Sequence, residues 1–245
     1  MICSSVKRFF TSNLLQVGDW TPDRCATRNR VASHLTYSTY VRIMLFMARH
    51  SNKQALLDAG LRVMFKQGFN GAAVRDVVAA ARVPQGSFTN HFPSKEQFGV
   101  EVLDQYFKHV QRLLEASLED RSLRPRARME RYLDLIIERL QADGFERGCL
   151  IGDLSIEITQ TSENIRSRLQ VVFEQWLRPF TECITEGQSL KEFNSNIEAK
   201  EIAEYFLASW EGAILRMKVE RSIAPLSRFR KIFFATISCS GATDG

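Results

Sequence analysis

The chain has 245 residues, of which 44% are hydrophobic and 25% are charged, an ordinary composition for a globular protein. Its longest apolar runs fall well short of the roughly 18 residues that a membrane-spanning helix needs, so we expect no membrane partner. The five cysteines, at positions 3, 25, 149, 183 and 239, are dispersed and lack metal-ligand spacing. This pattern argues against a disulfide framework and favours a reducing, cytoplasmic location.

The net charge of +5 is unevenly distributed along the chain. Residues 1–46 carry six basic and two acidic residues, and residues 47–95 carry seven basic and two acidic residues. The remaining residues, 96–245, have a net charge of −4. A cationic region joined to a mildly acidic remainder is expected where one part of a protein meets phosphates, although a chance surface imbalance gives the same numbers.

Residues 1–46 are not expected to belong to the fold. They mix Ser and Thr with scattered Arg, contain few acidic residues and show no sustained apolar period. This composition superficially matches an organellar transit peptide, and it also fits a disordered arm or a basic arm that touches DNA.

The first predicted helix covers residues 52–67. Ser51 and Gln54 form a capping-box pattern at its start, and Gly68 is a typical residue at a helix end. Apolar residues then recur at helical spacing in Val74, Val77 and Val78, which predicts a second, shorter helix.

A third, very short helix is predicted from Gln85 to Phe92. Pro84 separates it from the second helix, because proline disfavours the α conformation in the residue before it and fits best at a helix start. Phe88 and Phe92 lie one turn apart and are predicted to point inward. The polar side chains between them are then left on the outer surface.

The polar outer surface of this short helix is predicted to bind DNA. Gln and Asn side chains can form paired hydrogen bonds with adenine edges, and Ser and Thr can bond to bases or phosphates. A two-helix corner with a polar outside is the structural alternative. The residues predicted to bind DNA are Arg75, Gln85, Gly86, Ser87, Thr89, Asn90, His91 and Lys95.

Residues 51–100 closely resemble the DNA-binding domain of the TetR family of bacterial transcriptional regulators. The similarity is carried by Gln67-Gly68-Phe69, by Val74-Arg75-Asp76-Val77-Val78 and by the long string from Gly86 to Glu96, GSFTNHFPSKE. Two positions depart from the family pattern: Ala73 replaces the usual Thr or Ser cap, and Thr89 replaces a common DNA-contacting aromatic residue. Because family members usually begin just before the first helix, the resemblance favours Met47 as the physiological start.

The rest of the chain is predicted to be helical, so the fold class is all-α. An N-terminal three-helix domain with the helix-turn-helix, residues 47–95, precedes a C-terminal ligand-binding and dimerisation domain, residues 96–238, and a flexible tail, residues 239–245. Ser94 and Gln97 are expected to cap the first helix of the second domain. The helices predicted there cover residues 95–118, 129–142, 154–159, 162–187 and 225–237, with a kink or break at Pro179. A further helix, capped by Asn196, is predicted to include residues 202–217. Residues 121–128 are predicted to be a solvated linker.

The C-terminal domain shows no sign of catalytic chemistry. No phosphate loop, dinucleotide fingerprint or HExxH metal motif is present, and none of the four histidines pairs with an evident nucleophile or carboxylate motif. We therefore expect no catalytic residue, no metal site, no cofactor and no enzyme activity.

A small-molecule or electrophile effector is expected to bind the C-terminal domain. The run Arg147-Gly148-Cys149-Leu150-Ile151-Gly152 resembles a TetR subgroup related to regulators that sense electrophiles or acrylate-like compounds, in which a cysteine can be the sensor. Arg147 and the following helix N-terminus are expected to favour a Cys149 thiolate, whereas the alternative is an inert buried thiol. The residues predicted to line the effector pocket are Cys149, Phe173, Trp176, Trp210 and Glu211, and packing in the core is the alternative for each.

The last two predicted helices are wide and apolar, and the TetR resemblance implies that they form a homodimer interface. The predicted interface residues are Phe206, Trp210, Ile214, Met217, Phe229 and Phe233, with core packing inside one subunit as the alternative. The sequence thus predicts a ligand- or redox-responsive repressor that binds a palindromic double-stranded DNA operator as a homodimer. The alternative is a helical ligand-binding or small enzymatic protein whose helix-turn-helix is only a scaffold.

Overall fold

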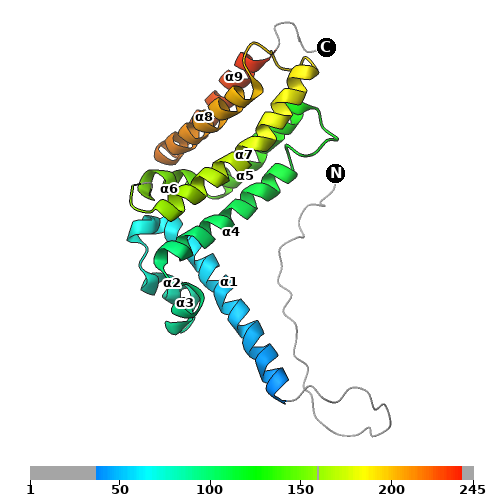
Figure 1. Cartoon of the computed structure of the whole chain (residues 1–245). Coiled ribbons are helices and arrows are strands. Elements are labelled where there is room, and N and C mark those ends of the chain that lie inside the picture. Colours follow the sequence, from blue (N-terminus) through cyan, green and yellow to red (C-terminus); the bar gives the residue numbers. More distant parts are fainter. Residues whose placement is uncertain (1–36, 159, 239–245) are drawn as a thin grey trace, which may run out of the picture. The chain divides into compact units, whose positions relative to one another are not determined.

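The computed structural model describes residues 37–158 and 160–238, with side chains from residue 52 onward. This part of the chain is helical, apart from connecting turns and one isolated bridge between Phe193 and Ser238, so the all-α prediction is confirmed. The chain divides into two units, residues 1–43 and 44–245. The described helices (Figure 1) are α1 (Tyr37–Gly71), α2 (Val74–Ala81), α3 (Gly86–His91), α4 (Lys95–Glu115), α5 (Pro125–Ala142), α6 (Leu150–Ile158), α7 (Glu163–Ser189), α8 (Ala199–Glu220) and α9 (Ala224–Ile237).

The start of the first helix differs from the sequence prediction. α1 begins at Tyr37 and runs through Ser51, which was predicted to be its cap. The capping pattern was misleading because neither Gly nor Pro occurs between Tyr37 and Ala59, so nothing in the sequence stops the helix upstream. The proposals for residues 1–36 and for the tail after Ser238 fall outside the described residues.

Gly68 interrupts the helical backbone of α1 at the position where the sequence predicted the helix to end. Its φ of 71° is left-handed, a conformation that glycine adopts without the steric cost borne by other residues. The next two backbone N–H groups, of Phe69 and Asn70, donate to the carboxylate of Glu157 on α6 at 2.8 and 2.6 Å. A Cβ at position 68 would lie 2.8 Å from that carboxylate, so glycine also permits the close approach.

The contact at Glu157 joins what we call the head, residues 52–94, to what we call the body, residues 95–238. In the body, α7 packs along α8 and α4, and α9 packs on α8 (Figure 1). The long helix α4 starts at its predicted cap, because the hydroxyl of Ser94 accepts from the backbone N–H of Gln97 at 3.0 Å. None of the described helices combines the length and apolar character that a membrane span requires.

The segment 121–128 is not the solvated linker that its four arginines predicted. α5 begins at Pro125, consistent with the preference of proline for the first turn of a helix. Arg128, four positions into the segment's helical part, is fully buried. Its guanidinium donates to the carbonyl of Leu118 at 3.1 Å and lies 2.6 Å from the carboxylate of Glu186, and these two partners permit its burial.

Two helix starts and one predicted break also differ from the sequence prediction. α6 begins at Leu150 rather than Leu154, and the residue before α8 is Glu198, which makes no side-chain capping bond, rather than Asn196. α7 continues through Pro179 without a break. Pro179 is buried against the rest of the body, so packing holds the helix where one backbone hydrogen bond is lost.

Candidate DNA-binding surface and ligand cavities

Helices α2 and α3 form a helix-turn-helix whose inner side is held by aromatic rings. Phe88 and Phe92 are both buried, as predicted, and pack against Phe98 of α4. The centroid of the Phe98 ring lies 5.1 Å from that of Phe88 and 4.8 Å from that of Phe92. Val77 and Val78 bury the inner side of α2. Because α3 has only six residues, its position depends on this packing rather than on its own helical hydrogen bonds.

The outer side of α3 is polar and accessible. Gln85, Gly86, Thr89 and Asn90 are exposed, and Arg75 on α2 has a side chain that is 85% exposed. The hydroxyl of Thr89 donates to the carbonyl of Gly86 at 3.1 Å. A Cβ at Gly86 would meet no atom within 4 Å, so the space in front of this glycine is open to a partner.

Ser87 does not belong to the outer surface, so its prediction as a DNA-binding residue is wrong. It is 8% exposed, and its hydroxyl accepts a long hydrogen bond of 3.5 Å from the amide of Asn52. In so short a helix the two consecutive positions 87 and 88 both face the head's interior. His91 is half-buried, with its ring centroid 6.2 Å from that of Phe92.

Lys95 was predicted to reach phosphate, but its ammonium group is engaged inside the protein. It donates to the carbonyl of Asn70 at 3.2 Å and lies 4.7 Å from the centroid of the Phe69 ring. Burial lowers the pKa of Lys95, and the charge of Glu157 acts in the opposite sense. Lys95 therefore secures the end of α1 together with Glu157.

The missing cap at Ala73 is partly replaced by Asp76. The Asp76 carboxylate, three residues into α2, accepts from the backbone N–H of Ala73 at 3.3 Å. This is one half of a capping box, formed without the Ser or Thr hydroxyl that usually supplies the other half.

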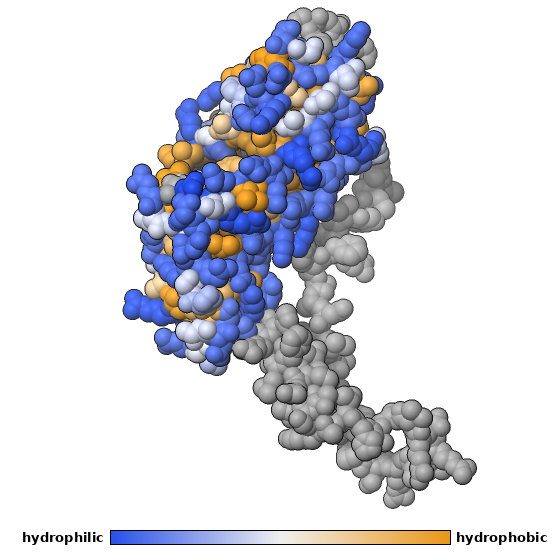
Figure 2. Space-filling model, in the orientation of Figure 1, coloured by the Kyte–Doolittle hydropathy of each residue, from blue (hydrophilic) through white to orange (hydrophobic). Residues whose placement is uncertain are grey.

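A cleft of about 710 Å³, which we call the outer cleft, lies in the body between α6, α7 and α8. Its size falls within the range of roughly 300 to 1,000 Å³ that is typical of small-molecule sites. Phe173, Leu177 and Leu207 contribute apolar wall, and the pair Asp153–Lys218, 3.3 Å apart, contributes charge. Apolar surface is visible over the helical body in Figure 2, within a mostly hydrophilic exterior.

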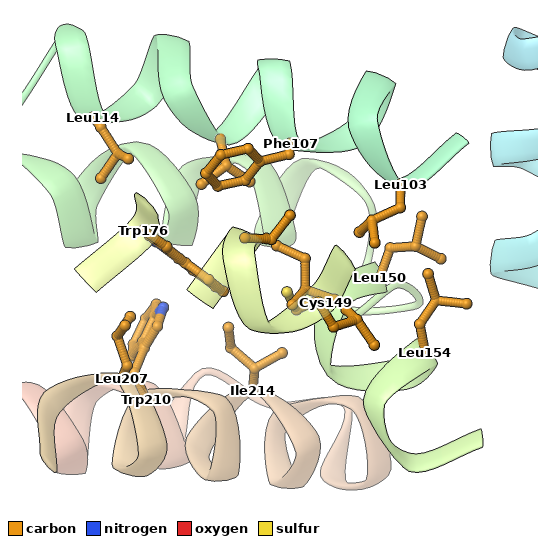
Figure 3. Close-up of a cluster of buried hydrophobic side chains, with 14 of the residues drawn as sticks. Leu103, Phe107, Leu114, Cys149, Leu150, Leu154, Trp176, Leu207, Trp210 and Ile214 are labelled. Atoms are coloured by element: carbon orange, nitrogen blue, oxygen red, sulfur yellow. The ribbon is translucent and has the colours of Figure 1, made fainter. Parts of the chain in front are cut away.

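A smaller, more enclosed cavity of about 80 Å³, which we call the inner cavity, lies deeper in the body. Trp176 and Trp210 line it, and the indole N–H of Trp176 donates to the hydroxyl of Tyr132 at 3.1 Å. Figure 3 shows Trp176 of α7, Trp210 of α8 and Cys149, which directly precedes α6, directed into this apolar interior. Of the five residues predicted to line an effector pocket, Cys149 and Glu211 border both cavities, Phe173 borders the outer cleft, and the tryptophans border the inner cavity.

The thiol of Cys149 is held in its neutral form. Burial raises the pKa of Cys149 well above its ordinary value, and the nearby charge of Glu211 raises it further. The backbone N–H groups of Gly152 and Ile151 at the start of α6, together with the Tyr106 hydroxyl, oppose this rise without overcoming it.

The expectation that Arg147 favours a Cys149 thiolate is wrong. The Arg147 side chain is 58% exposed, pairs with Asp143 at 3.2 Å, and lies over the ring of Phe65. Its positive charge therefore faces solvent and a carboxylate instead of the buried sulfur.

Among the described carboxyl groups of the body, Glu211 has a pKa well above its ordinary value. Burial raises its pKa to about 7, Asp153 adds to the rise, and a hydrogen bond from the Cys149 thiol opposes it. Glycine at position 152 makes room for this side chain, because a Cβ there would lie 2.5 Å from Oε2 of Glu211.

All six residues predicted to contact a second subunit are buried within this one. Their periodic apolar side chains form the core between α8, α9 and the rest of the body, where the ring of Phe206 contacts those of Phe229 and Phe233. Phe206, Trp210, Ile214 and Met217 are therefore not available to a partner, and the prediction that these four make direct interface contacts is wrong. Phe229 and Phe233 also line a groove between α8 and α9. The large apolar residues that stay exposed on α8 and α9 are Tyr205, Leu215, Val219 and Ile232.

A polar recognition helix held on an all-helical head, joined to a body with a ligand-sized cleft, defines a ligand-responsive helix-turn-helix transcriptional regulator. Two family models match the chain: residues 56–102 match bacterial regulatory proteins of the tetR family, and residues 125–233 match the tetracyclin repressor-like C-terminal domain. The chain belongs to the TetR family.

Named relatives agree with this assignment. The chain is 44% identical to the HTH-type transcriptional repressor DhaR of Mycobacterium sp. strain GP1, over 78% of this chain and 94% of the relative. It is 36% identical to the transcriptional regulator AcuR of Cereibacter sphaeroides, over 74% and 82%. The crystal structure of regulatory protein TetR from Rhodobacter sphaeroides has 35% identity and a TM-score of 0.72, covering 75% of this chain and 97% of that chain. These relatives are named as regulators, which favours regulation over the ligand-binding or enzymatic alternative.

Sequence reasoning missed Glu157, although it connects head and body. It lies 88 residues from Phe69, and no local pattern marks an acceptor for backbone N–H groups so far away. Asp76 could have been found, because an acidic residue three positions after a helix cap is the second half of a capping box.

The raised pKa of Glu211 predicts a pH-dependent stability. Between the ordinary value of 4.5 and about 7 the folded chain keeps a proton that the unfolded chain loses, so stability falls as pH rises through this window. We expect Glu211→Gln to remove this fall and to be more stable than the wild type at pH 8, by on the order of 3 kcal/mol.

Urea unfolding at pH 4.5, 6, 7 and 8 measures this difference. Glu174→Gln, which changes an exposed carboxylate on the outer cleft, is the matched control and should keep the fall in stability that the wild type shows. A stability difference between Glu211→Gln and wild type that does not vary with pH would contradict the assignment.

Proposed function

We propose that the protein is a homodimeric repressor that binds a palindromic DNA operator and leaves it when a small molecule binds the body. The observation that carries the proposal is the placement of α3: its inner side is fixed by Phe88 and Phe92, and its outer side presents Gln85, Thr89 and Asn90. Such a helix fits the major groove, where side-chain amides read base edges. The relative DhaR is named a repressor, which supports this direction of regulation.

Charge supports the proposed DNA contact. Residues 47–95 carry a net charge of +5, whereas residues 96–245 carry −4. The exposed Arg75 on α2 is placed to meet phosphate beside the groove. A protein with this partner acts where the chromosome is, so we propose a cytoplasmic location.

We place the dimer interface on the outward faces of α8 and α9. A palindrome is read by two recognition helices about 34–36 Å apart, which requires a second copy of the chain. A shallow groove between α8 and α9 is lined by Tyr205 and Gly212 on one side and Arg228 and Ile232 on the other. Tyr205 and Ile232 are more than half exposed, so this face supplies apolar area that the core residues cannot.

Helix α6 provides a physical link between ligand and DNA. Gly152 and Asp153 in its first turn border the outer cleft, and Glu157 near its end holds the backbone of Phe69 and Asn70. A ligand that shifts α6 therefore acts directly on the backbone of the head at Phe69 and Asn70. A coupling free energy of about 1–3 kcal/mol between the two sites would change operator affinity roughly 5- to 150-fold.

Base recognition by α3 can be tested by substituting its exposed side chains. We expect Gln85→Ala combined with Thr89→Ala to weaken specific operator binding by at least about tenfold while leaving non-specific binding nearly unchanged, because phosphate contacts are retained. Gel shifts with an operator obtained by capturing genomic fragments, and with unrelated DNA of equal length, measure both affinities.

Gln170→Ala, an exposed change on α7, serves as the matched control. Equal losses on the two DNAs would reject base reading by this helix.

A second candidate mode of response is covalent modification of Cys149. Cys149 borders both cavities and directly precedes α6, so an adduct there would press on the helix that reaches the head. The buried neutral thiol makes this reaction slow, so reversible binding is the mode that we favour.

The covalent mode predicts a specific loss of operator binding with N-ethylmaleimide as the probe. Wild type and Cys183→Ser, which changes the other buried thiol among the described residues, should both lose operator affinity, whereas Cys149→Ser should keep it. Equal release of all three proteins would remove Cys149 from the response.

A further inference from the structure

Two polar atoms among the residues that line the inner cavity are buried without a hydrogen-bond partner. They are the indole nitrogen Nε1 of Trp210 and the carboxyl oxygen Oε1 of Glu211, consecutive residues on α8. Trp210 is completely buried, and Figure 3 shows its indole nitrogen turned away from α8 toward the interior. The neighbouring polar groups do have partners: Trp176 Nε1 donates to the Tyr132 hydroxyl, and the Tyr106 hydroxyl donates to Cys149 Sγ at 3.8 Å.

Unpaired polar atoms of this kind are uncommon, because burying one without a partner costs free energy. Here one atom is a donor and the other an acceptor, and they come from adjacent positions beside one cavity. A single group that both accepts and donates a hydrogen bond would satisfy both atoms.

The charges around the cavity restrict that group further. A ligand with an anionic group would place that charge against the Glu211 carboxyl. A ligand with an ammonium group has no lone pair with which to accept a hydrogen bond from Trp210. Arg139 also borders the cavity, and its positive charge disfavours a cation. A neutral hydroxyl meets both requirements.

We propose that the inner cavity binds the hydroxyl group of a small aliphatic alcohol, whose oxygen accepts from Trp210 Nε1 and whose proton is donated to Glu211 Oε1. Apolar side chains, among them Val110, Ile136 and Ile214, surround the alkyl part. The lining of the inner cavity shares Gly148, Cys149, Glu211 and Ile214 with that of the outer cleft, so a longer alkyl chain has adjoining apolar space.

A water molecule also accepts and donates hydrogen bonds, so the size and polarity of the inner cavity decide whether water or an alcohol is the better occupant. About 80 Å³ is several times the roughly 10–15 Å³ that one water requires, and most of the wall offers no hydrogen bond. An alkyl group fills this apolar remainder, whereas further waters would lack partners there.

The test is a titration of the full-length chain, labelled with ¹⁵N in its indole groups, with 1-butanol. Trp210→Phe assigns the Trp210 indole resonance, which we expect to shift saturably. Methyl propyl ether, an isomer of 1-butanol that accepts but cannot donate, should bind about tenfold more weakly. Trp210→Phe and Glu211→Met, followed through thermal stabilisation by 1-butanol, should each weaken its binding by a similar factor. Glu201→Gln, an exposed change on α8 that borders neither cavity, should leave it unchanged.

Absence of a saturable shift, equal affinity for the two isomers, or unchanged 1-butanol affinity in both cavity variants would each overturn the proposal. If a variant fails to fold, the comparison of the two isomers on the wild-type chain still decides. The inference rests on the proposed function only in treating the bound alcohol as the effector. Saturable binding that leaves operator affinity unchanged would support the site and contradict release by its ligand, whereas loss of base reading by α3 would appear in the DNA assays alone.

Discussion

The contact on which the rest of the structure depends is that between the Glu157 carboxylate and the backbone at the end of α1. Two backbone N–H groups that follow the break in the helix at Gly68, those of Phe69 and Asn70, donate to one side chain from the body. Gly68 allows the approach, and Lys95 secures the same segment by bonding the carbonyl of Asn70. Charge-assisted bonds to a backbone are short and directional, and on the side of the head they end on backbone atoms and not on a flexible side chain. We therefore propose that a shift of α6 would be transmitted to the head.

Sequence periodicity predicted most of the fold but could not assign every buried face. The spacing of Val77, Val78, Phe88 and Phe92 gave the inner sides of α2 and α3, since local geometry alone decides which positions share a face. The same reasoning failed for Phe206 and Trp210, because an apolar stripe does not reveal whether it meets its own chain or a second copy. Ser87 failed for a related reason: six residues are too few for periodicity to separate inside from outside.

Interactions between distant segments were beyond local patterns. Arg128 was predicted to be solvated, and its burial depends on a carbonyl at Leu118 and on Glu186, far along the chain. The effector-pocket residues were found as aromatic, thiol and carboxyl groups, yet their division between an outer cleft and an inner cavity follows only from how α6, α7 and α8 pack. The apolar surroundings of that region explain its chemistry, since they hold Cys149 neutral and raise the pKa of Glu211 to about 7.

The most direct measurement of the link between body and head is amide hydrogen exchange at Phe69 and Asn70, paired with operator affinity, in Glu157→Gln. We expect both amides to exchange faster and operator affinity to fall by at least about fivefold, because an amide side chain has one acceptor oxygen and no charge for the two N–H groups. Glu201→Gln, an exposed change on α8, should alter neither quantity. Faster exchange at the two amides with operator affinity unchanged would contradict the role of this contact.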